Sequence, residues 1–417
     1  MDVTAEPLSP RRADATVVDA VEASMLQLPL RYLPDRAANA ERRYVVRVTG
    51  CPPYTITSDG PRCEVRQVAT GNAHAELHTD PASWLDIVSG HRDGLDCFFL
   101  GLLEVFGDLN EALRLETLFA PPEDSPGALR HARLVRYPFG RGAIETFEAG
   151  DPSAPPVLFL HGLGASKVSL LPAIAGMAET HRVIAMDFPG FGKSSAPVGA
   201  RYDAAWMASA AMATLDAADV SRAAIVGNSM GGRVAVELAL LHPERVSALG
   251  LLCPAVAFDE YRLVRPLLNF MLMDTMGVAP WPLSSAWPRR FIDAGLRSMF
   301  ADPSRVPAAN LVAAREDFIR VMGSRNRRMA FLASTRRLGL EAPTKFWHRL
   351  GELAVPSLWI FAEHDRLVTC TYAENVRRHL PGATVEVWED CGHVPQFEHP
   401  VRTVERLREF FAAATVS

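Results

Sequence analysis

The feature that most constrains this chain is the segment 225–232, which reads Ile-Val-Gly-Asn-Ser-Met-Gly-Gly. An apolar run over 223–226 ends at this Gly-x-Ser-x-Gly pattern, and helical periodicity begins at once and continues to residue 241. The order predicts a strand, a sharp turn and a helix, with glycines that let the two backbones pass closely. The turn would lift the hydroxyl of Ser229 beyond the sheet edge, where the N–H groups of the helix start face any negative charge that forms.

Length and composition restrict the class of protein. The 417 residues predict two or three domains, and 48% hydrophobic with 22% charged residues is typical of a globular chain. A net charge of −5 argues against a nucleic-acid partner. The chain contains no uninterrupted apolar run of about 18 residues, so we expect no transmembrane span. Residues 1–12 lack the apolar stretch of a secretion signal. The six scattered cysteines are typical of reduced thiols, so we expect a cytoplasmic location.

A break in composition divides the chain. Residues 120–127 read Ala-Pro-Pro-Glu-Asp-Ser-Pro-Gly, and adjacent prolines, charges and glycine favour a linker over the interior of a helix or strand. We therefore expect a first domain over 1–120, a linker over 121–131 and a second domain over 132–417.

The first segment predicts a small α+β domain. Helical spacing covers 17–33, and further helices are expected after Asp80-Pro81 and after Asp108, which suit helix starts. Alternating or apolar runs predict five short strands, the second and third joined by an Asp59-Gly60 turn. The expected strands cover 43–48, 54–58, 63–68, 75–78 and 103–106.

Three short motifs of this segment carry a resemblance to a known family. They are Asp-Pro-Ala-Ser-Trp at 80–84, Leu-Glu-Val-Phe-Gly-Asp-Leu at 103–109 and Ala-Leu-Arg-Leu at 112–115. Together they resemble the sterol-carrier-protein family over about residues 15–120. The resemblance implies a tunnel for lipids or fatty-acyl chains, and hence a bound lipid as a partner. A dimerisation or interaction domain with a filled core remains the alternative, so a homo-oligomer stays open.

The second segment alternates strands and helices, which predicts a doubly wound, mostly parallel sheet. The expected strands cover 156–160, 181–186, 223–226, 248–253, 356–361 and 383–387, and a closing helix covers 401–414. Residues 257–353 interrupt this rhythm with helical, Met-, Trp- and Arg-rich sequence, which predicts an inserted helical lid.

A serine nucleophile needs a base, and the base needs an orienting carboxylate. The strand before residue 362 is followed by Ala-Glu-His-Asp, which offers Asp365, and the strand before residue 388 is followed by a loop that ends in His393. Both groups follow Ser229 in the order that this architecture requires. Rival groups remain open as alternatives: Glu363 for the acid, and His364, His399 and His348 for the base. A metal site on His364 and His393 is disfavoured because no cluster of further ligands is evident.

The developing oxyanion needs two N–H donors close to the serine. The backbone N–H of Met230 follows the nucleophile directly. The loop after the strand 156–160 reads His-Gly-Leu-Gly at 161–164, and the N–H of Leu163 is the expected second donor. We expect His161 to pack and hydrogen bond beneath that loop.

These residues resemble the α/β-hydrolase fold family over about 130–415. A serine nucleophile argues against haloalkane dehalogenase or epoxide hydrolase chemistry, which the family runs through an aspartate. The stretch 227–232 is also similar to the carbon–carbon hydrolases that cut ring-cleavage products. Two departures weaken that reading: Leu163 stands where those enzymes usually carry Ser, and Val394 follows His393 where they usually carry Trp.

The expected activity is therefore serine hydrolysis of hydrophobic carboxylic esters, without a cofactor or metal, on a small-molecule or lipid ester. The apolar lid sequence is the substrate hint, because flexible Met side chains suit a long acyl group. The candidate substrate-binding residues of the lid are Phe270, Met271, Met273 and Trp281. Carbon–carbon bond hydrolysis and a catalytically silent lipid-binding protein remain the alternatives.

Overall fold

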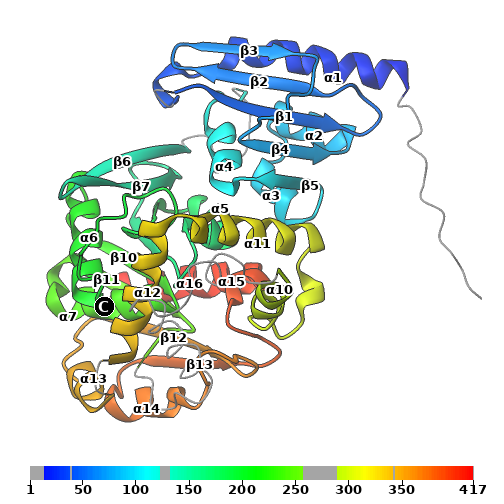
Figure 1. The fold of residues 1–417 in the computed structure, drawn as a ribbon. Coiled ribbons are helices and arrows are strands. Elements are labelled where there is room, and N and C mark those ends of the chain that lie inside the picture. The colour runs from blue at the N-terminus through cyan, green and yellow to red at the C-terminus, as the bar shows by residue number, and fades with distance from the viewer. Residues whose placement is uncertain (1–13, 38–39, 123–131, 257–288, 341–342, 417) are drawn as a thin grey trace, which may run out of the picture. The chain divides into compact units, whose positions relative to one another are not determined.

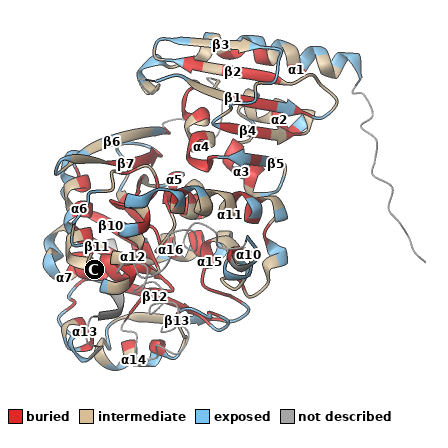
Figure 2. Ribbon diagram, in the orientation of Figure 1, coloured by how far each residue is buried: buried red, intermediate tan, exposed pale blue. Residues whose placement is uncertain are grey.

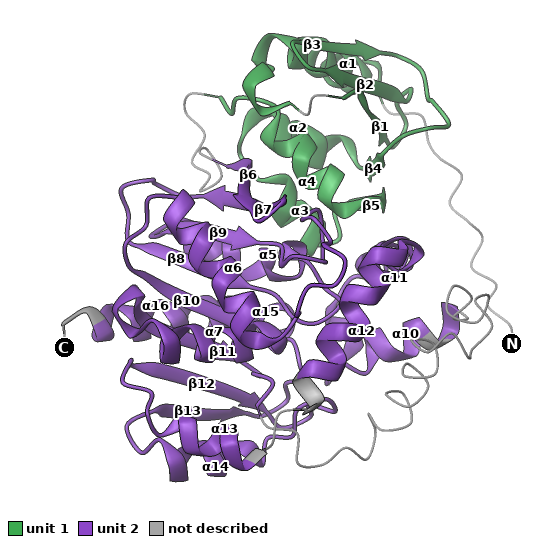
Figure 3. Cartoon of the chain, turned by 60° about the vertical axis from the view of Figure 1, so that its left-hand side comes forward, with its two compact units in different colours: residues 1–130 green, residues 131–417 purple. Residues whose placement is uncertain are grey.

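The computed structural model describes residues 14–37, 40–122, 132–256, 289–340 and 343–416. The chain forms two compact units, residues 1–130 and residues 131–417 (Figure 3). Among the described helices none is long and apolar enough to cross a membrane.

The N-terminal unit is an α+β fold with one five-stranded sheet in the order β3-β2-β1-β4-β5. β1 and β4 are parallel and the other pairs are antiparallel. Trp84 of α2 donates its indole N–H to Ser24 of α1 at 2.9 Å, which ties the two helices together. The elements are α1 (Ala15–Gln27), β1 (Arg42–Val48), β2 (Tyr54–Asp59), β3 (Arg62–Arg66), β4 (Ala75–Thr79), α2 (Pro81–Ser89), α3 (Gly94–Phe99), β5 (Leu103–Gly107) and α4 (Leu109–Thr117).

The C-terminal unit is built on an eight-stranded sheet in the order β13-β12-β11-β10-β8-β9-β7-β6. The six strands β8 to β13 run parallel, and the β6–β7 hairpin adds two antiparallel strands at one edge. The strands are β6 (Arg133–Phe139), β7 (Gly142–Ala149), β8 (Pro156–Leu160), β9 (Arg182–Met186), β10 (Ala223–Asn228), β11 (Val246–Leu252), β12 (Ser357–Ala362) and β13 (Thr384–Trp388).

Helices cover both faces of this sheet (Figure 1). On one face, the side chain of Leu249 in β11 packs in a core that includes α6 and α7. The next residue, Gly250, faces the opposite side, where Leu407 and Phe411 of α16 lie. Such alternation places most of the parallel strands inside the molecule, where Figure 2 shows them buried. The helices are α5 (Leu171–Ala178), α6 (Ala204–Ala217), α7 (Met230–Leu241), α14 (Tyr372–His379), α15 (Pro395–Glu398) and α16 (Pro400–Val416).

Between β11 and β12 the chain leaves the sheet. The described part of this insertion, residues 289–340 and 343–353, is helical and contains no strand. Its helices are α10 (Arg289–Arg297), α11 (Ala308–Gly323), α12 (Arg325–Leu340) and α13 (Pro343–Leu350). α13 is anchored on α7, because Arg349 makes two hydrogen bonds, of 3.0 and 2.8 Å, to the carboxylate of Glu237.

The structure differs from the sequence-based expectations in one helix end and contains two elements that were not expected. The helix expected over 17–33 ends at Gln27 and is followed by a 3-10 turn over Leu28–Arg31, because Pro29 has no N–H to continue it. α3 was not anticipated, since its six residues are too few for a periodic pattern. The β6–β7 hairpin was also missed: β6 contains Pro138 and is largely half-exposed, so it lacks the apolar run of its parallel neighbours.

Candidate active site

The carboxyl ends of parallel strands bring the expected site residues to one edge of the sheet. Ser229 follows β10, Asp365 follows β12, His393 follows β13, and the loop 161–164 follows β8. Because β8, β10, β11, β12 and β13 are adjacent and parallel, their carboxyl ends lie side by side. Residues far apart in the sequence therefore meet at this edge, which is where open α/β sheets bind their ligands.

Ser229 lies in a strained turn between β10 and α7. Its backbone angles, φ 53° and ψ −117°, are outside the regions that a side chain ordinarily allows. A Cβ built at Gly231 would lie 2.0 Å from the carbonyl oxygen of Leu160, so only glycine fits where helix and strand cross. The turn is held in place because the N–H of Ala255 donates to the Ser229 carbonyl at 2.9 Å.

Asp365 and His393 are in direct contact. Asp365 Oδ2 lies 2.7 Å from Nδ1 of His393, and its Oδ1 accepts the N–H groups of Leu367 and Val368 at 2.8 and 2.9 Å. Both residues are buried. A carboxylate held in this way orients the imidazole with a proton on Nδ1, which leaves Nε2 as the basic nitrogen.

The rival groups have their partners elsewhere. The side chains of Glu363 and His364 are each 53% exposed and lie 4.0 Å from one another. His348 lies 3.8 Å from a glutamate of its own segment and is 82% exposed. His399 Nε2 lies 3.0 Å from the carbonyl oxygen of Asp390. We keep Asp365 as the proposed acid and His393 as the proposed base, because they are the pair in contact.

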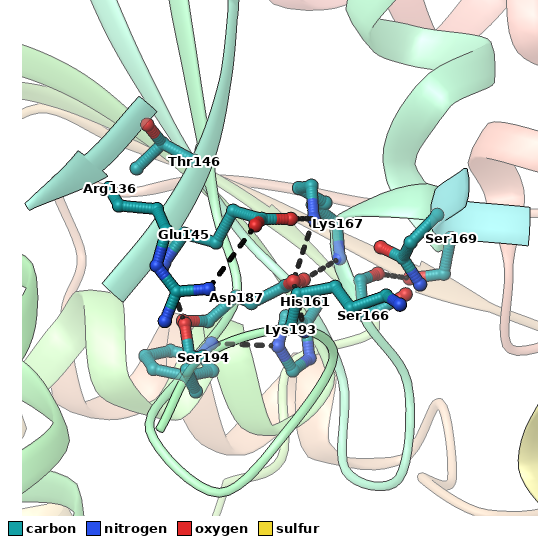
Figure 4. A network of polar contacts seen from close by, with 12 residues as sticks. Arg136, Glu145, Thr146, His161, Ser166, Lys167, Ser169, Asp187, Lys193 and Ser194 are labelled. Carbon is teal, nitrogen blue, oxygen red and sulfur yellow. Dashed lines mark hydrogen bonds and ion pairs between the residues drawn. The ribbon is translucent and has the colours of Figure 1, made fainter. Parts of the chain in front are cut away.

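The loop after β8 is oriented by His161 (Figure 4). His161 Nε2 accepts the N–H of Phe188 at 3.0 Å, so Nδ1 carries the proton and donates to the carbonyl of Gly162 at 2.7 Å. Burial lowers the pKa of His161, which keeps the ring neutral for both bonds. In a trans peptide the carbonyl and the next N–H point in opposite directions, so the N–H of Leu163 is directed away from His161. A Cβ at Gly162 would lie 3.4 Å from that of Ser229, which brings this loop beside the serine.

A buried ionic cluster supports the same loop. The ammonium of Lys167 lies 2.7 Å from Asp187 Oδ2 and 3.2 Å from Glu145 Oε1, and all three side chains are buried (Figure 4). Burial alone would lower the pKa of Lys167, but the two carboxylates raise it above its ordinary value. Asp187 also accepts the N–H groups of Lys167 and Lys193, so one carboxylate joins the loops after β8 and β9.

Two neighbours of the site were not anticipated from the sequence. Asn228 Nδ2 donates to the carbonyls of Leu252 and His393, at 2.9 and 3.2 Å, and so links the serine turn to the histidine loop. Cys253 is buried directly after β11, and its sulfur lies within 4.8 Å of ligand atoms of Asp365 and His393. Asn228 was visible within the Gly-x-Ser-x-Gly pattern, but its carbonyl partners had no sequence signal.

Cys253, Asp365 and His393 are the groups of the described chain that could together hold a metal. Burial and the nearby Asp365 carboxylate raise the pKa of Cys253 well above its ordinary value, so the sulfur is a neutral thiol and not the thiolate that metals prefer. Asp365 and His393 are in addition hydrogen bonded to one another, through Oδ2 and Nδ1. We therefore assign these residues no metal.

The described helices of the insertion approach the site with aromatic side chains. A Cβ built at Gly164 would lie 2.9 Å from Phe331 of α12 and 3.3 Å from Phe318 of α11. The two rings contact each other edge to face, with centroids 6.2 Å apart. The substrate-binding residues expected from the sequence, Phe270, Met271, Met273 and Trp281, lie outside the described residues.

Comparison with known proteins decides the family. Residues 155–400 match the family model of the α/β hydrolase fold. The chain belongs to the α/β hydrolase fold family. This α/β hydrolase is 30% identical over 263 residues to the 2-hydroxymuconate semialdehyde hydrolase of Pseudomonas putida, which covers 62% of this chain and 88% of the relative. It also matches a 2-hydroxy-6-oxononadienedioate/2-hydroxy-6-oxononatrienedioate hydrolase of Burkholderia vietnamiensis, with 30% identity over 61% of this chain and 86% of the relative.

Solved structures give the same fold. A membrane phospholipase A superimposes with a TM-score of 0.56 and 26% identity, over 69% of this chain and 87% of that one. A naproxen esterase from Bacillus subtilis has a TM-score of 0.53 and 21% identity, over 67% and 91%. This α/β hydrolase is thus an enzyme of the hydrolase class. Its residues 25–120 match the SCP-2 sterol transfer family, so a sterol-carrier domain precedes the hydrolase.

Proposed function

We propose that this α/β hydrolase cleaves hydrophobic carboxylic esters through an acyl-enzyme. Ser229 attacks the ester carbonyl while His393 Nε2 takes its proton, and His393 then returns the proton to the leaving alcohol. Asp365 holds the imidazole and stabilises its charged form. The N–H groups of Leu163 and Met230 stabilise the oxyanion, and water then releases the acid by the same steps in reverse.

The observation that carries the proposal is the 2.7 Å contact between His393 and Asp365 at the strand edge that also holds Ser229. Three further features of the site support the proposal. The turn at Ser229 is strained, His393 is buried, and the loop that carries Leu163 is oriented by His161. A hydrophobic ester is favoured because Phe318 and Phe331 contact that loop with apolar rings.

Replacement of the nucleophile tests the proposal. Ser229→Ala should lower kcat for a soluble short-chain ester by about 10⁶-fold, because members of such a triad act as a unit. The variant should also lose labelling by a fluorophosphonate probe, whereas Ser209→Ala, at an exposed serine of α6, should keep both. Ester turnover that persists in purified, folded Ser229→Ala would refute the assignment. A wild-type protein that is folded but never labelled would favour the silent lipid-binding alternative.

Carbon–carbon bond hydrolysis is the second candidate, because two relatives at 30% identity are named as hydrolases of 2-hydroxymuconate semialdehyde and of 2-hydroxy-6-oxononadienedioate. Leu163 and Val394 speak against it, since the sequence departs from those enzymes there. When the enzyme is mixed with a dienol ring-cleavage substrate, the absorbance of the dienol should stay unchanged, although the same enzyme cleaves simple esters. Rapid loss of the dienol absorbance would reverse the order of the two candidates.

A further inference from the structure

One buried carboxylate joins the loop that carries His393 to the helical insertion. The side chain of Glu398, on α15, is fully buried, and its Oε2 accepts the N–H of Gly392 at 2.7 Å. Its Oε1 accepts the N–H groups of Ala301 and Asp302 at 2.9 and 3.1 Å. Both oxygens of one carboxylate are thus used, one by each segment, in charge-assisted hydrogen bonds.

The two segments also touch directly. The N–H of His393 itself donates to the carbonyl of Met299, at 2.6 Å, just beyond the end of α10. A Cβ built at Gly392 would lie 2.4 Å from the same carbonyl oxygen, so the backbones are in contact. The backbone at His393 is therefore held by the insertion as well as by β13.

A contact at the surface joins the same two segments, the insertion and the loop that carries His393. Arg305 donates to the carbonyl and to the carboxylate of Asp390, and its guanidinium lies 3.9 Å from Glu398 Oε1. Asp390 is in the histidine loop, but its side chain is 66% exposed. An exposed pair contributes little, so the buried carboxylate carries most of the connection between the two segments.

We propose that Glu398 is a positioning residue that couples the insertion, through residues 299–302, to the catalytic base. The proposal rests on the assignment of His393 as base under the proposed function. Glu398 touches no reacting atom. Through Oε2, Glu398 fixes the backbone of Gly392 and His393, and thereby the position of His393 Nε2 relative to Ser229. This position holds only while Oε1 of Glu398 stays hydrogen bonded to the insertion. A displaced insertion would therefore misplace the base.

Glu398→Gln is the test, because an amide offers one acceptor oxygen where the carboxylate offers two. Whichever way the amide lies, its NH₂ faces N–H donors, and the bond to one of the two segments is lost. We expect kcat and kcat/KM for a soluble ester to fall together by about 10- to 100-fold, since a small misplacement of a catalytic group has that effect. Asp390→Asn, a matched change in the same loop, should retain the wild-type kcat.

A Glu398→Gln enzyme with the kinetics of Asp390→Asn would overturn the proposal. A Glu398→Gln enzyme with a changed KM and an unchanged kcat would overturn it too.

If the Glu398→Gln variant does not fold, hydrogen exchange of the wild-type protein is the deciding test. The amides of Gly392, Ala301 and Asp302 should exchange through one common opening, because they share one carboxylate. Exchange of Ala301 and Asp302 that is much faster than that of Gly392 would refute the coupling. Hydrogen exchange can be measured on a protein without activity. A wild-type protein that lacks esterase activity would therefore refute the proposed function and leave the test of the coupling intact.

Discussion

Two residues of the C-terminal unit are held in states that an isolated chain would avoid. Ser229 has a positive φ, which costs on the order of 1–3 kcal/mol for a residue with a side chain. Lys167 is a fully buried cation. The two are connected through the loop 161–167, which runs from beside Ser229 to the partners of Lys167. A strained site is thus supported by a polar cluster that must itself be complete.

Removal of the cation should be costly. Lys167→Met leaves Asp187 and Glu145 buried without the ammonium between them, and breaking a buried ion pair from one side costs about 3–5 kcal/mol. Chemical denaturation of the variant should show a loss of free energy of unfolding of that size. Lys345→Met, at an exposed lysine of α13, should change it by less than about 0.5 kcal/mol. Equal stabilities of the two variants would contradict this account.

At the residue scale the sequence supplied the candidate reacting groups but not the contacts that hold them. The places of Ser229, Asp365 and His393 after strands could be predicted, because strand ends are readable from apolar runs. The partners of those residues are mostly backbone groups: Leu367 and Val368 for Asp365, Met299 for the N–H of His393. Every residue has a backbone carbonyl and every residue except proline has a backbone N–H, so such contacts leave no mark in the sequence. The role of Glu398 could not be predicted for the same reason, because its partners are backbone N–H groups.

At the element scale, buried strands were the most predictable. β8 was expected at its observed bounds, and β10 to β13 within a few residues, since strands buried on both faces need uninterrupted apolar side chains. The β6–β7 hairpin has one exposed edge and needs no such run, and α3 has only six residues. Elements whose stability comes from neighbours, rather than from their own periodicity, were the ones that the sequence did not reveal.

A prediction about α3 and α4 follows from their contact. Glu116 of α4 accepts the N–H of Gly94 at the start of α3, at 2.8 Å. Burial, reinforced by Asp93, raises the pKa of Glu116 from 4.5 to about 8. The folded form therefore keeps a proton that the unfolded chain has already lost, so stability falls as pH rises between these two values. The slope for one group is at most about 1.4 kcal/mol per pH unit.

Asp93 titrates lower, because burial and Asp96 raise its pKa only to about 6, so the window from pH 6 to 8 reports on Glu116. Hydrogen exchange of residues 94–117 in the full chain should show protection that declines across this window. Glu116→Gln should flatten the decline, since the amide has no proton to lose. Glu104→Gln, at an exposed residue of β5, should leave it unchanged. A decline that persists in Glu116→Gln would assign it to another group.

At the scale of the whole molecule, the chain joins a sterol-carrier domain to a hydrolase domain. Tethering makes a second binding event intramolecular, and a linker as short as the one expected over 121–131 gives an effective concentration on the order of millimolar. For an ester that scarcely dissolves, such a concentration far exceeds what free diffusion supplies. We therefore expect the first domain to hold a lipid and present it to Ser229, a role that soluble substrates do not need.

Separation of the two domains tests this role. A specific protease site placed within residues 121–131 allows the same purified protein to be assayed before and after cleavage. Hydrolysis of short, soluble esters should stay nearly constant, because the residues proposed for the chemistry all belong to residues 131–417. Turnover of long-chain or sterol-like esters should fall, and more steeply at low protein concentration, because only the tethered form keeps its millimolar local supply. Equal losses for both substrate classes would make the first domain a support for folding or dimerisation. No loss for either would separate its lipid binding from the hydrolysis.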